Sequence, residues 1–221
     1  MQKVFVVLLT LAAWGAPAAA QEAASAAFTE SATFIVRRGD DTVAIERFRR
    51  GPMVLKGVLY LRLEVPITEK ISAVIDSTGT MPLVEVVEFR NSDTLDTSPS
   101  QHARIIFRDD SVAVDALTGN GIQTRLFQTE RGALPYLNLS FALLEQAVRR
   151  GLLIGGDTVA LPFFNLGGGQ TATGTLARNG SSATLTLGRV PIVLELDATG
   201  RIVKGEIASQ GVTVTRVDGA P

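Results

Sequence analysis

Three short stretches of this sequence combine aspartate with threonine or serine, residue types that can bind calcium or transfer protons. They are DTVA (41–44), DSVA (110–113) and DTVA (157–160). A calcium loop supplies about six or more oxygens within a few residues, and no copy has the Asp-x-Asp-x-Asp spacing that this requires. Each copy instead follows a turn and begins a run of alternating residues, and aspartate and threonine side chains commonly fix turns. We therefore interpret all three as strand-opening turns.

The other groups that could perform catalysis are isolated from one another. The chain has 0 Cys and 1 His, which is His102, so thiol nucleophiles, thiolate metal sites and histidine-rich zinc sites are excluded. No serine lies in the Gly-x-Ser-x-Gly elbow that could complete a triad with His102. Glu195 and Asp197 share one face of a predicted strand, which is typical of the solvated side of an outer strand. We predict no catalytic residue, no metal site and no cofactor.

The glycine-rich segment NLGGGQTATG (165–174) partly resembles a phosphate-binding loop. Gly169 and Gly174 have the spacing of the two loop glycines, but Thr175 stands where a P-loop has lysine. A strand pattern follows, whereas a P-loop leads into a helix. Nucleotide binding is therefore not supported.

The first residues have the pattern of an export signal. Lys3 precedes the apolar run VFVVLLTLAAW (4–14), and APAAA (16–20) ends in the small-x-small pattern read by signal peptidases. The apolar run is too short to cross a bilayer, which takes about 20 residues. We expect cleavage after Ala20, a flexible leader over 21–27, and a periplasmic or extracellular protein without a transmembrane segment.

Composition and charge describe an ordinary soluble chain. Lys+Arg number 21 and Asp+Glu 22, and removal of residues 1–20 takes away only Lys3, which leaves 20 against 22 and a net charge of −2. This balance gives no electrostatic reason to expect nucleic acid or an anionic membrane surface as partner. Without cysteine there are no disulfides, so the fold depends on packing alone.

Alternation of apolar and polar residues dominates the rest of the chain and predicts strands. In VLKGVLYLRLEV (54–65) one face holds leucines with Gly57 among them, and the other holds Lys56, Val58, Tyr60, Arg62 and Glu64. Turn residues separate the runs, and their close succession favours antiparallel pairing. The predicted strands are 31–38, 42–50, 54–65, 70–78, 82–90, 103–109, 111–117, 122–129, 158–164, 171–177, 182–188, 190–196, 201–208 and 211–217.

One segment has the period of a helix instead. From 138 to 150, apolar residues recur every three or four positions and form a single stripe. Asn138 or Ser140 could cap its start, and Gly151 could end it in the left-handed conformation. The economical arrangement is a strongly curved antiparallel meander, a half-open barrel of about a dozen strands, with this helix packed on it. A sandwich with a peripheral helix is the alternative. We expect one β-rich domain over 28–217 and a tail over 218–221.

The aromatic residues offer the best candidates for a ligand site. Tyr60 lies on the mixed face of the clearest strand, Tyr136 precedes the helix, Phe141 belongs to its apolar stripe, and Phe164 ends a strand beside the glycine-rich segment. Ordinary packing also explains such residues. A site, if present, is expected where the helix meets the sheet.

The signal peptide, the meander and the late single helix together resemble bacterial exported proteins of the lipoprotein-carrier type. In that fold a half-open antiparallel barrel is lidded by helix and receives acyl chains. The resemblance is architectural, covers residues 28–217 loosely and includes no diagnostic motif. The segment TFIVRRGDDTVAIERFRR (33–50) is also similar to the opening of secreted bacterial proteins of unknown function.

These observations lead to three functional hypotheses. The first is a non-enzymatic exported protein that binds an apolar or amphipathic ligand, such as a lipid or acyl chain, between sheet and helix. The second is an accessory module that binds an envelope protein or polymer through a strand edge or loops. The third is an enzyme of unrecognised class that uses scattered Asp, Glu or Arg residues.

Overall fold

The structure of the chain is a computed structural model, which describes residues 28–90, 98–118 and 121–219. The expected signal peptide (1–20) and leader (21–27) lie outside the described residues. The described part is mainly β, as the alternation predicts, with one α-helix, α2 (Phe141–Ile154), and a short 3-10 turn, η1 (Ala208–Gln210).

The strands meander through most of the chain. Their bounds are β1 (Glu30–Arg38), β2 (Asp41–Arg50), β3 (Val54–Leu61), β4 (Ile67–Val74), β5 (Leu83–Arg90), β6 (Gln101–Arg108), β7 (Ser111–Thr118), β8 (Gly121–Gln128), β9 (Leu134–Tyr136), β10 (Thr158–Asn165), β11 (Thr171–Asn179), β12 (Ser182–Leu187), β13 (Val190–Leu196), β14 (Ile202–Ile207) and β15 (Val212–Asp218). β15 thus extends into the segment expected as a tail.

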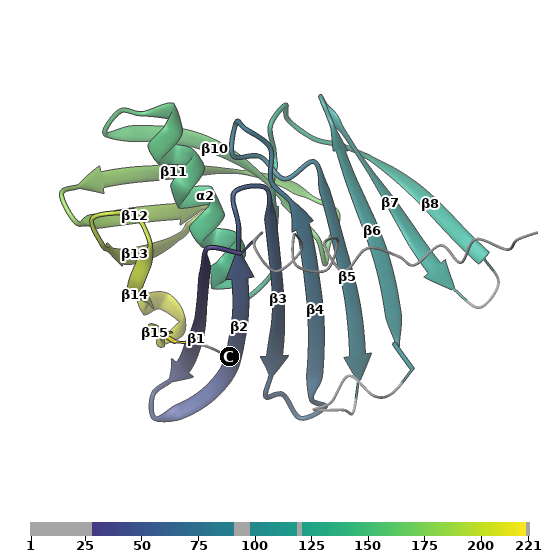
Figure 1. Cartoon of the computed structure of the whole chain (residues 1–221), viewed down its shortest axis with the longest axis horizontal. Helices are drawn as coiled ribbons and strands as arrows, with labels where there is room; N and C mark the ends of the chain where they lie inside the picture. The colour runs from purple at the N-terminus through teal and green to yellow at the C-terminus, as the bar shows by residue number, and fades with distance from the viewer. Residues whose placement is uncertain (1–27, 91–97, 119–120, 220–221) are drawn as a thin grey trace, which may run out of the picture.

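All of these strands belong to one sheet. Their order is β8-β7-β6-β5-β4-β3-β2-β1-β15-β14-β13-β12-β11-β10-β9, so the described chain starts at the middle, reaches one edge at β8, and returns from the other edge to the middle (Figure 1). Neighbouring strands pair antiparallel except β9 and β10, which are parallel. The helix α2 is the crossover between them, because a parallel pair cannot be joined by a tight turn.

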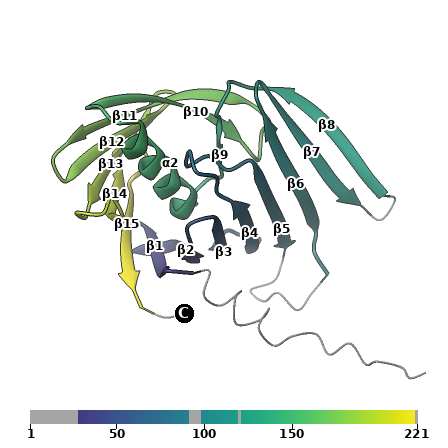
Figure 2. The same ribbon diagram turned by 45° about the horizontal axis from the view of Figure 1, so that its top comes forward.

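The sheet is strongly curved, and α2 lies inside the curve (Figure 2). The edges approach each other at one end, where the Phe127 ring of β8 lies 5.6 Å from the Phe164 ring of β10. The hydroxyls of Thr129 and Thr171 meet there at 2.8 Å. The predicted half-open barrel around one helix is therefore confirmed.

The apolar stripe of α2 packs into the concave face of the sheet. Phe141, Leu143, Leu144, Ala147 and Val148 are all buried in one core cluster with side chains of the sheet. The length and hydropathy needed to cross a bilayer occur together in no helix of the described residues.

The ends of α2 differ from those expected. Ser140 is the N-cap residue, but its hydroxyl makes no cap bond and donates instead to Glu46. Gly151 lies inside the helix, and Gly155, at φ 82°, follows its end. A Cβ at Gly151 would lie 2.4 Å from a methyl group of Leu176, so this glycine allows a close approach of helix to sheet, which a sequence pattern does not reveal.

Three strand predictions need correction. The strand expected over 54–65 ends at Leu61, and Leu63 and Val65 are exposed in the turn that follows. The strand expected over 70–78 is β4, Ile67–Val74, because residues 76–80 form a turn. The short strand β9 was not predicted, since three residues are too few to show alternation.

The three Asp-Thr/Ser-Val-Ala stretches begin β2, β7 and β10, as expected of strand-opening turns. The turns before them contain left-handed residues: Gly39 at φ 58°, Asp109 at φ 27° and Gly156 at φ 91°. Their aspartates form no metal-binding group within the described residues.

Aspartate does fix turns, but at two other places. In DSTGT (76–80) and DATGR (197–201), one carboxylate oxygen accepts bonds from the backbone amides two and four residues further on, at 2.8–3.0 Å. Burial raises the pKa of Asp76 and Asp197, but hydrogen bonds from threonine hydroxyls, together with these amide bonds, outweigh it and leave both pKa values lowered. Gly79 and Gly200 bring these loops against the last turns of α2.

Candidate functional site

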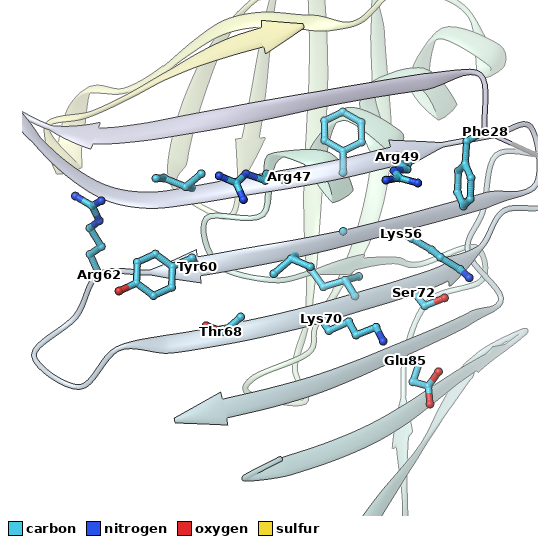
Figure 3. Close-up of a pocket in the computed structure, with 15 residues that line it drawn as sticks. Phe28, Arg47, Arg49, Lys56, Tyr60, Arg62, Thr68, Lys70, Ser72 and Glu85 are labelled. Atoms are coloured by element: carbon cyan, nitrogen blue, oxygen red, sulfur yellow. The ribbon is translucent and has the colours of Figure 1, made fainter. Parts of the chain in front are cut away.

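A broad surface depression lies on the convex face of the sheet, on the side opposite α2. It is an open groove of about 960 Å³ across β2, β3, β4 and β5, and we call it the outer groove (Figure 3). A volume of this size falls in the range of small-molecule sites, roughly 300–1,000 Å³. The residues that form it include Phe28, Ile45, Arg47, Arg49, Lys56, Val58, Tyr60, Arg62, Thr68, Lys70, Ser72 and Glu85.

Strand register gathers four cations at the centre of the outer groove. Arg49 of β2 lies directly opposite Lys56 of β3. In the next row Arg47 and Lys70 lie on either side of Val58, through the pairs Arg47–Val58 and Val58–Lys70. All four cationic side chains are exposed. We call Arg47, Arg49, Lys56 and Lys70 the four-cation cluster.

No acidic side chain neutralises the four-cation cluster. Within the described residues none of the four side chains forms an ion pair or a side-chain hydrogen bond, and the same is true of Arg62. Like charges on directly opposed positions of a sheet repel each other. The cluster is therefore a local excess of positive charge on a chain whose net charge is −1.

Apolar side chains share the groove with these cations. Val58 lies between Arg47 and Lys70, and in the adjoining row Ile45 pairs with Tyr60. Figure 3 shows Arg62 beside Tyr60 at one end and Phe28 near Lys56 at the other. The arrangement offers apolar contact and positive charge to the same ligand.

On β5, β6 and β7 two ion pairs lie on this face. The Glu85 carboxylate lies 2.5 Å from Nε2 of His102. On the next strands Arg104 donates to Asp115 at 3.1 Å, and Thr124 donates to the same carboxylate at 2.7 Å, which lowers its pKa. The outer groove differs from these strands because four cations without an ion pair in the described chain lie together there.

The opposite face of the same strands carries a buried ion network. Glu145 of α2 is fully buried and contacts Arg50, Arg149 at 3.4 Å and Arg216 at 2.7 Å. Its second oxygen also accepts the backbone amide of Ile202 at 2.9 Å. This single carboxylate therefore ties the helix to strands from both halves of the sheet.

Two more carboxylates complete this inner network. Glu30 accepts from Arg149 at 2.7 Å and Arg216 at 2.6 Å, and Asp218 accepts from Arg216 at 2.5 Å. Three arginines thus face three carboxylates. The Arg216 guanidinium also lies over the rings of Phe34 and Phe48, 5.7 and 5.5 Å from their centres. Such closed, buried pairing is typical of a structural role.

Glu46 supplies the start of α2 with the cap that Ser140 does not provide. Its two oxygens accept the Ser140 hydroxyl at 2.6 Å and the Ala142 amide at 2.8 Å. Burial raises the pKa of Glu46 to about 7, and these hydrogen bonds oppose the rise. Glu46 is fully buried, and its hydrogen bonds hold the start of α2 against β2.

Glu69 is a second inward carboxylate with an altered pKa. Burial, reinforced by the nearby charges of Glu88 and Glu46, raises the pKa of Glu69 to about 7. One of its oxygens is buried without a hydrogen-bond partner in the described part of the chain. Glu88 occupies the directly opposed position on β5, and the neutral form of Glu69 that burial favours avoids repulsion between the two carboxylates.

The four aromatic candidates do not form one site. Tyr60 lies in the outer groove. Phe141 and Phe164 are buried in the core, where Phe141 packs against Phe34 and Phe164 against Phe107 and Phe127. Tyr136 is half-buried beside the same core, and burial raises its pKa. The expected junction of helix and sheet is therefore filled by these and other core side chains.

The polar candidates are also dispersed. His102 is paired with Glu85 on the outer face, Glu195 faces Lys204 at 3.6 Å, and Asp197 belongs to its turn. Among the described residues there is no group of three His, Asp or Glu side chains that could hold a metal ion. The outer groove, by contrast, brings charged and apolar side chains together.

The sequence contains a signal for the outer groove. Alternation already places Lys56, Val58 and Tyr60 on one face, and Arg47 and Arg49 also share a face. Their meeting depends on the register between strands, and counting clusters along the chain finds only pairs such as Arg49-Arg50. The net charge of the chain does not reveal the local excess of positive charge that β2, β3 and β4 create together.

Comparison with known proteins supports the fold. No family model matches the sequence, and a search of curated proteins finds no match. Among solved structures, the chain is similar to a DUF1089 family protein from Pseudomonas aeruginosa, with a TM-score of 0.55 and 11% sequence identity, over 77% of this chain and 92% of that chain. At this identity the likeness shows a shared mainly β architecture and nothing about a ligand.

Proposed function

We propose that this protein is a non-enzymatic binding protein whose outer groove holds an amphipathic, lipid-like molecule. The observation that carries the proposal is the combination of unpaired cations with Ile45, Val58 and Tyr60 in one open groove. An amphipathic molecule has both a charged or polar end and an apolar part, so it can use both kinds of contact at once. The protein acts in the periplasm or outside the cell, because residues 1–20 have the pattern of an export signal.

The proposed site lies on the opposite face of the sheet from the site expected at the sequence level. The space between α2 and the sheet is occupied by fully buried side chains, among them Phe34, Phe141 and Leu143. Protein interiors are packed as densely as organic crystals, and a ligand there would have to displace these groups. Binding on the outer face leaves this core intact.

Native mass spectrometry of the protein purified without detergent tests the proposal. We expect a lipid-like molecule to co-purify with the wild-type protein and to be lost from Tyr60→Ala. The matched control is Tyr136→Ala, the other tyrosine of the chain, which lies beside the core and should retain the ligand while lowering stability. Retention by Tyr60→Ala with loss from Tyr136→Ala would move the site to the interior. If no amphipathic molecule co-purifies with the protein and none binds when it is added, the proposed function is rejected.

A second candidate function is that of an accessory module that binds an envelope protein, and strand β8 favours it. β8 is an edge of the sheet, and its outward side chains Ile122 and Leu126 are 64% and 77% exposed. An exposed edge can accept a further strand from a partner. Thr124→Pro, which puts a break in this edge, should abolish capture of a defined envelope partner, whereas Tyr60→Ala should not.

A further inference from the structure

We infer that the four-cation cluster is the head-group site of the amphipathic ligand and takes a phosphate-bearing lipid. The inference rests on the proposed function and goes beyond it, because it names the charge and chemistry of the ligand. It is carried by the geometry of Arg47, Arg49, Lys56 and Lys70 around Val58.

The first step is the close placement of the cations. Arg49 and Lys56 occupy directly opposed positions on paired strands, where Cβ atoms are about 4.5–5.5 Å apart. Arg47 and Lys70 lie in the adjoining row, one strand away from Val58 on each side. Val58 therefore has a cation on three sides, counting Lys56 two residues before it, and Tyr60 on the fourth. An anion above Val58 would lie within reach of all four charges.

The second step is the lack of an acidic partner. In the row of Arg49 and Lys56 the first carboxylate is Glu85, which follows Ser72 across the strands and is bound to His102. On the inner face, by contrast, Arg50, Arg149 and Arg216 are all matched by carboxylates. Strand β2 thus pairs its buried Arg50 with acids and leaves its exposed Arg47 and Arg49 without an ion pair in the described chain. A bound anion would supply the missing negative charge.

The third step is the choice of anion. A phosphate group carries up to about two negative charges and several acceptor oxygens, whereas a carboxylate carries one charge and two oxygens. Arginine binds phosphate with a planar fork and lysine with a point charge, and the cluster contains two of each. Four cations around one position therefore suit phosphate better than carboxylate.

The fourth step is the orientation of the ligand. From Val58 the groove continues to Ile45 and Tyr60, in the row adjoining that of Arg47 and Lys70. The head group placed in the four-cation cluster leaves the apolar part of the ligand over Ile45 and Tyr60. The ligand is thus a single lipid with its phosphate bound to the protein, in preference to free phosphate, which uses no apolar contact.

Three probes test the inference: one has both a phosphate group and acyl chains, and each of the others lacks one of the two. They are a short-chain phosphatidic acid, the diacylglycerol with the same chains, and inorganic phosphate, each titrated by calorimetry into the full mature protein at low salt. We expect phosphatidic acid to bind at least about tenfold more tightly than either of the other two. High salt should remove most of this preference, because exposed charges are screened.

Variants assign the preference to named side chains. We expect Arg47→Gln combined with Lys56→Gln and Lys70→Gln to bind phosphatidic acid no better than diacylglycerol. The matched control is Arg125→Gln, an exposed arginine of β8 that forms no ion pair in the described chain and should keep the preference. All four positions are exposed, so folding should be unaffected, and circular dichroism verifies this.

The possible failures are distinguishable. Equal binding of phosphatidic acid and diacylglycerol would overturn the head-group site and leave the proposed function standing. Binding of inorganic phosphate as tightly as phosphatidic acid would show a phosphate site and overturn the lipid assignment. Absence of binding by both lipids would overturn the inference and the proposed function together.

Discussion

Arg49 and Arg50 are neighbours in β2, but their side chains lie on opposite faces of the sheet. Arg50 points inward, where it is 3% exposed and bound to the buried carboxylate of Glu145. Arg49 points outward, opposite Lys56, and has no partner in the described chain. Successive residues of a strand face opposite sides of the sheet, so one dipeptide contributes to two different surfaces.

The inner network of ion pairs and the outer four-cation cluster affect stability in different ways. Removal of a partner from a buried ion pair leaves an uncompensated charge in the interior. The stability of the fold therefore depends on keeping the inner network complete. Cations on the outer face repel one another and contribute nothing to stability. Proteins keep such locally unfavourable arrangements at sites of function. The comparison therefore supports a structural role for the inner network and the proposed ligand site on the outer face.

The largest expected effect comes from breaking the inner network. Glu145→Leu should lower the free energy of unfolding by about 3–5 kcal/mol, because Arg50 and Arg216 would then be buried without their main partner. Urea unfolding measures the change. Arg49→Met on the outer face is the control and should stay within about 0.5 kcal/mol of the wild type. Equal losses in the two variants would erase the distinction between the faces.

The next effect is the pH dependence of stability from the inward carboxylates. The folded-state pKa of Glu46 and of Glu69 is about 7, above the ordinary value of 4.5. Between these values the folded protein binds more protons than the unfolded chain, so stability is full below pH 4.5 and falls as pH rises through about 7. The loss should be up to about 3 kcal/mol for each group. Thermal unfolding across this range measures it.

Glu46→Gln and Glu69→Gln are the matched variants for this pH dependence. Each should flatten part of the slope, because glutamine does not titrate. Asp76 and Asp197 have lowered pKa values, so their contribution is lost only below their ordinary value of 3.8, outside this range. A wild-type stability that rises between pH 4.5 and 7 would contradict the assignment.

A smaller effect of opposite sign is expected from a carboxylate placed in the outer groove. Val58→Glu puts a negative charge between Arg47 and Lys70, and should raise stability by up to about 1 kcal/mol. The same variant should weaken lipid binding at least about tenfold, because the new side chain occupies the anion position. Differential scanning calorimetry and calorimetric titration measure the two effects.

Val193→Glu is the control for this substitution. Val193 is an exposed strand residue that lies opposite Glu206, so a second carboxylate there meets a like charge. It should lower stability slightly and leave binding unchanged. If Val58→Glu also destabilises, the outer cations are not a repelling cluster.

The smallest effect concerns salt. Screening of the four-cation cluster should raise the free energy of unfolding of the wild type by a few tenths of a kcal/mol between low and moderate ionic strength. Lys56→Gln removes one member of the closest pair and should reduce this gain. Chemical unfolding by urea, which is uncharged, measures both proteins. A larger gain in Lys56→Gln than in the wild type would oppose the interpretation.

Much of the fold could be predicted from local pattern. Alternation placed nearly all strands, and the helical stripe around Phe141 and Leu144 placed α2 within a few residues. The errors have local causes: Gly151 resembles a helix terminator but is a packing contact with Leu176, and β9 is too short to show a pattern. Of the aromatic site candidates, Phe141 and Phe164 belong to the core and Tyr60 lies in the outer groove, a difference that depends on burial in the folded sheet.

The sequence by itself determined which residues share a face of each strand, because the period of two is a property of the backbone. It also determined that the protein is mainly β, with one helix whose stripe must be covered. Only the tertiary structure decided which strands are neighbours and in what register. Glu145 therefore meets Arg216, 71 residues away, and Arg49 meets Lys56. Such contacts between elements that are separate in the sequence produce both the inner network and the four-cation cluster.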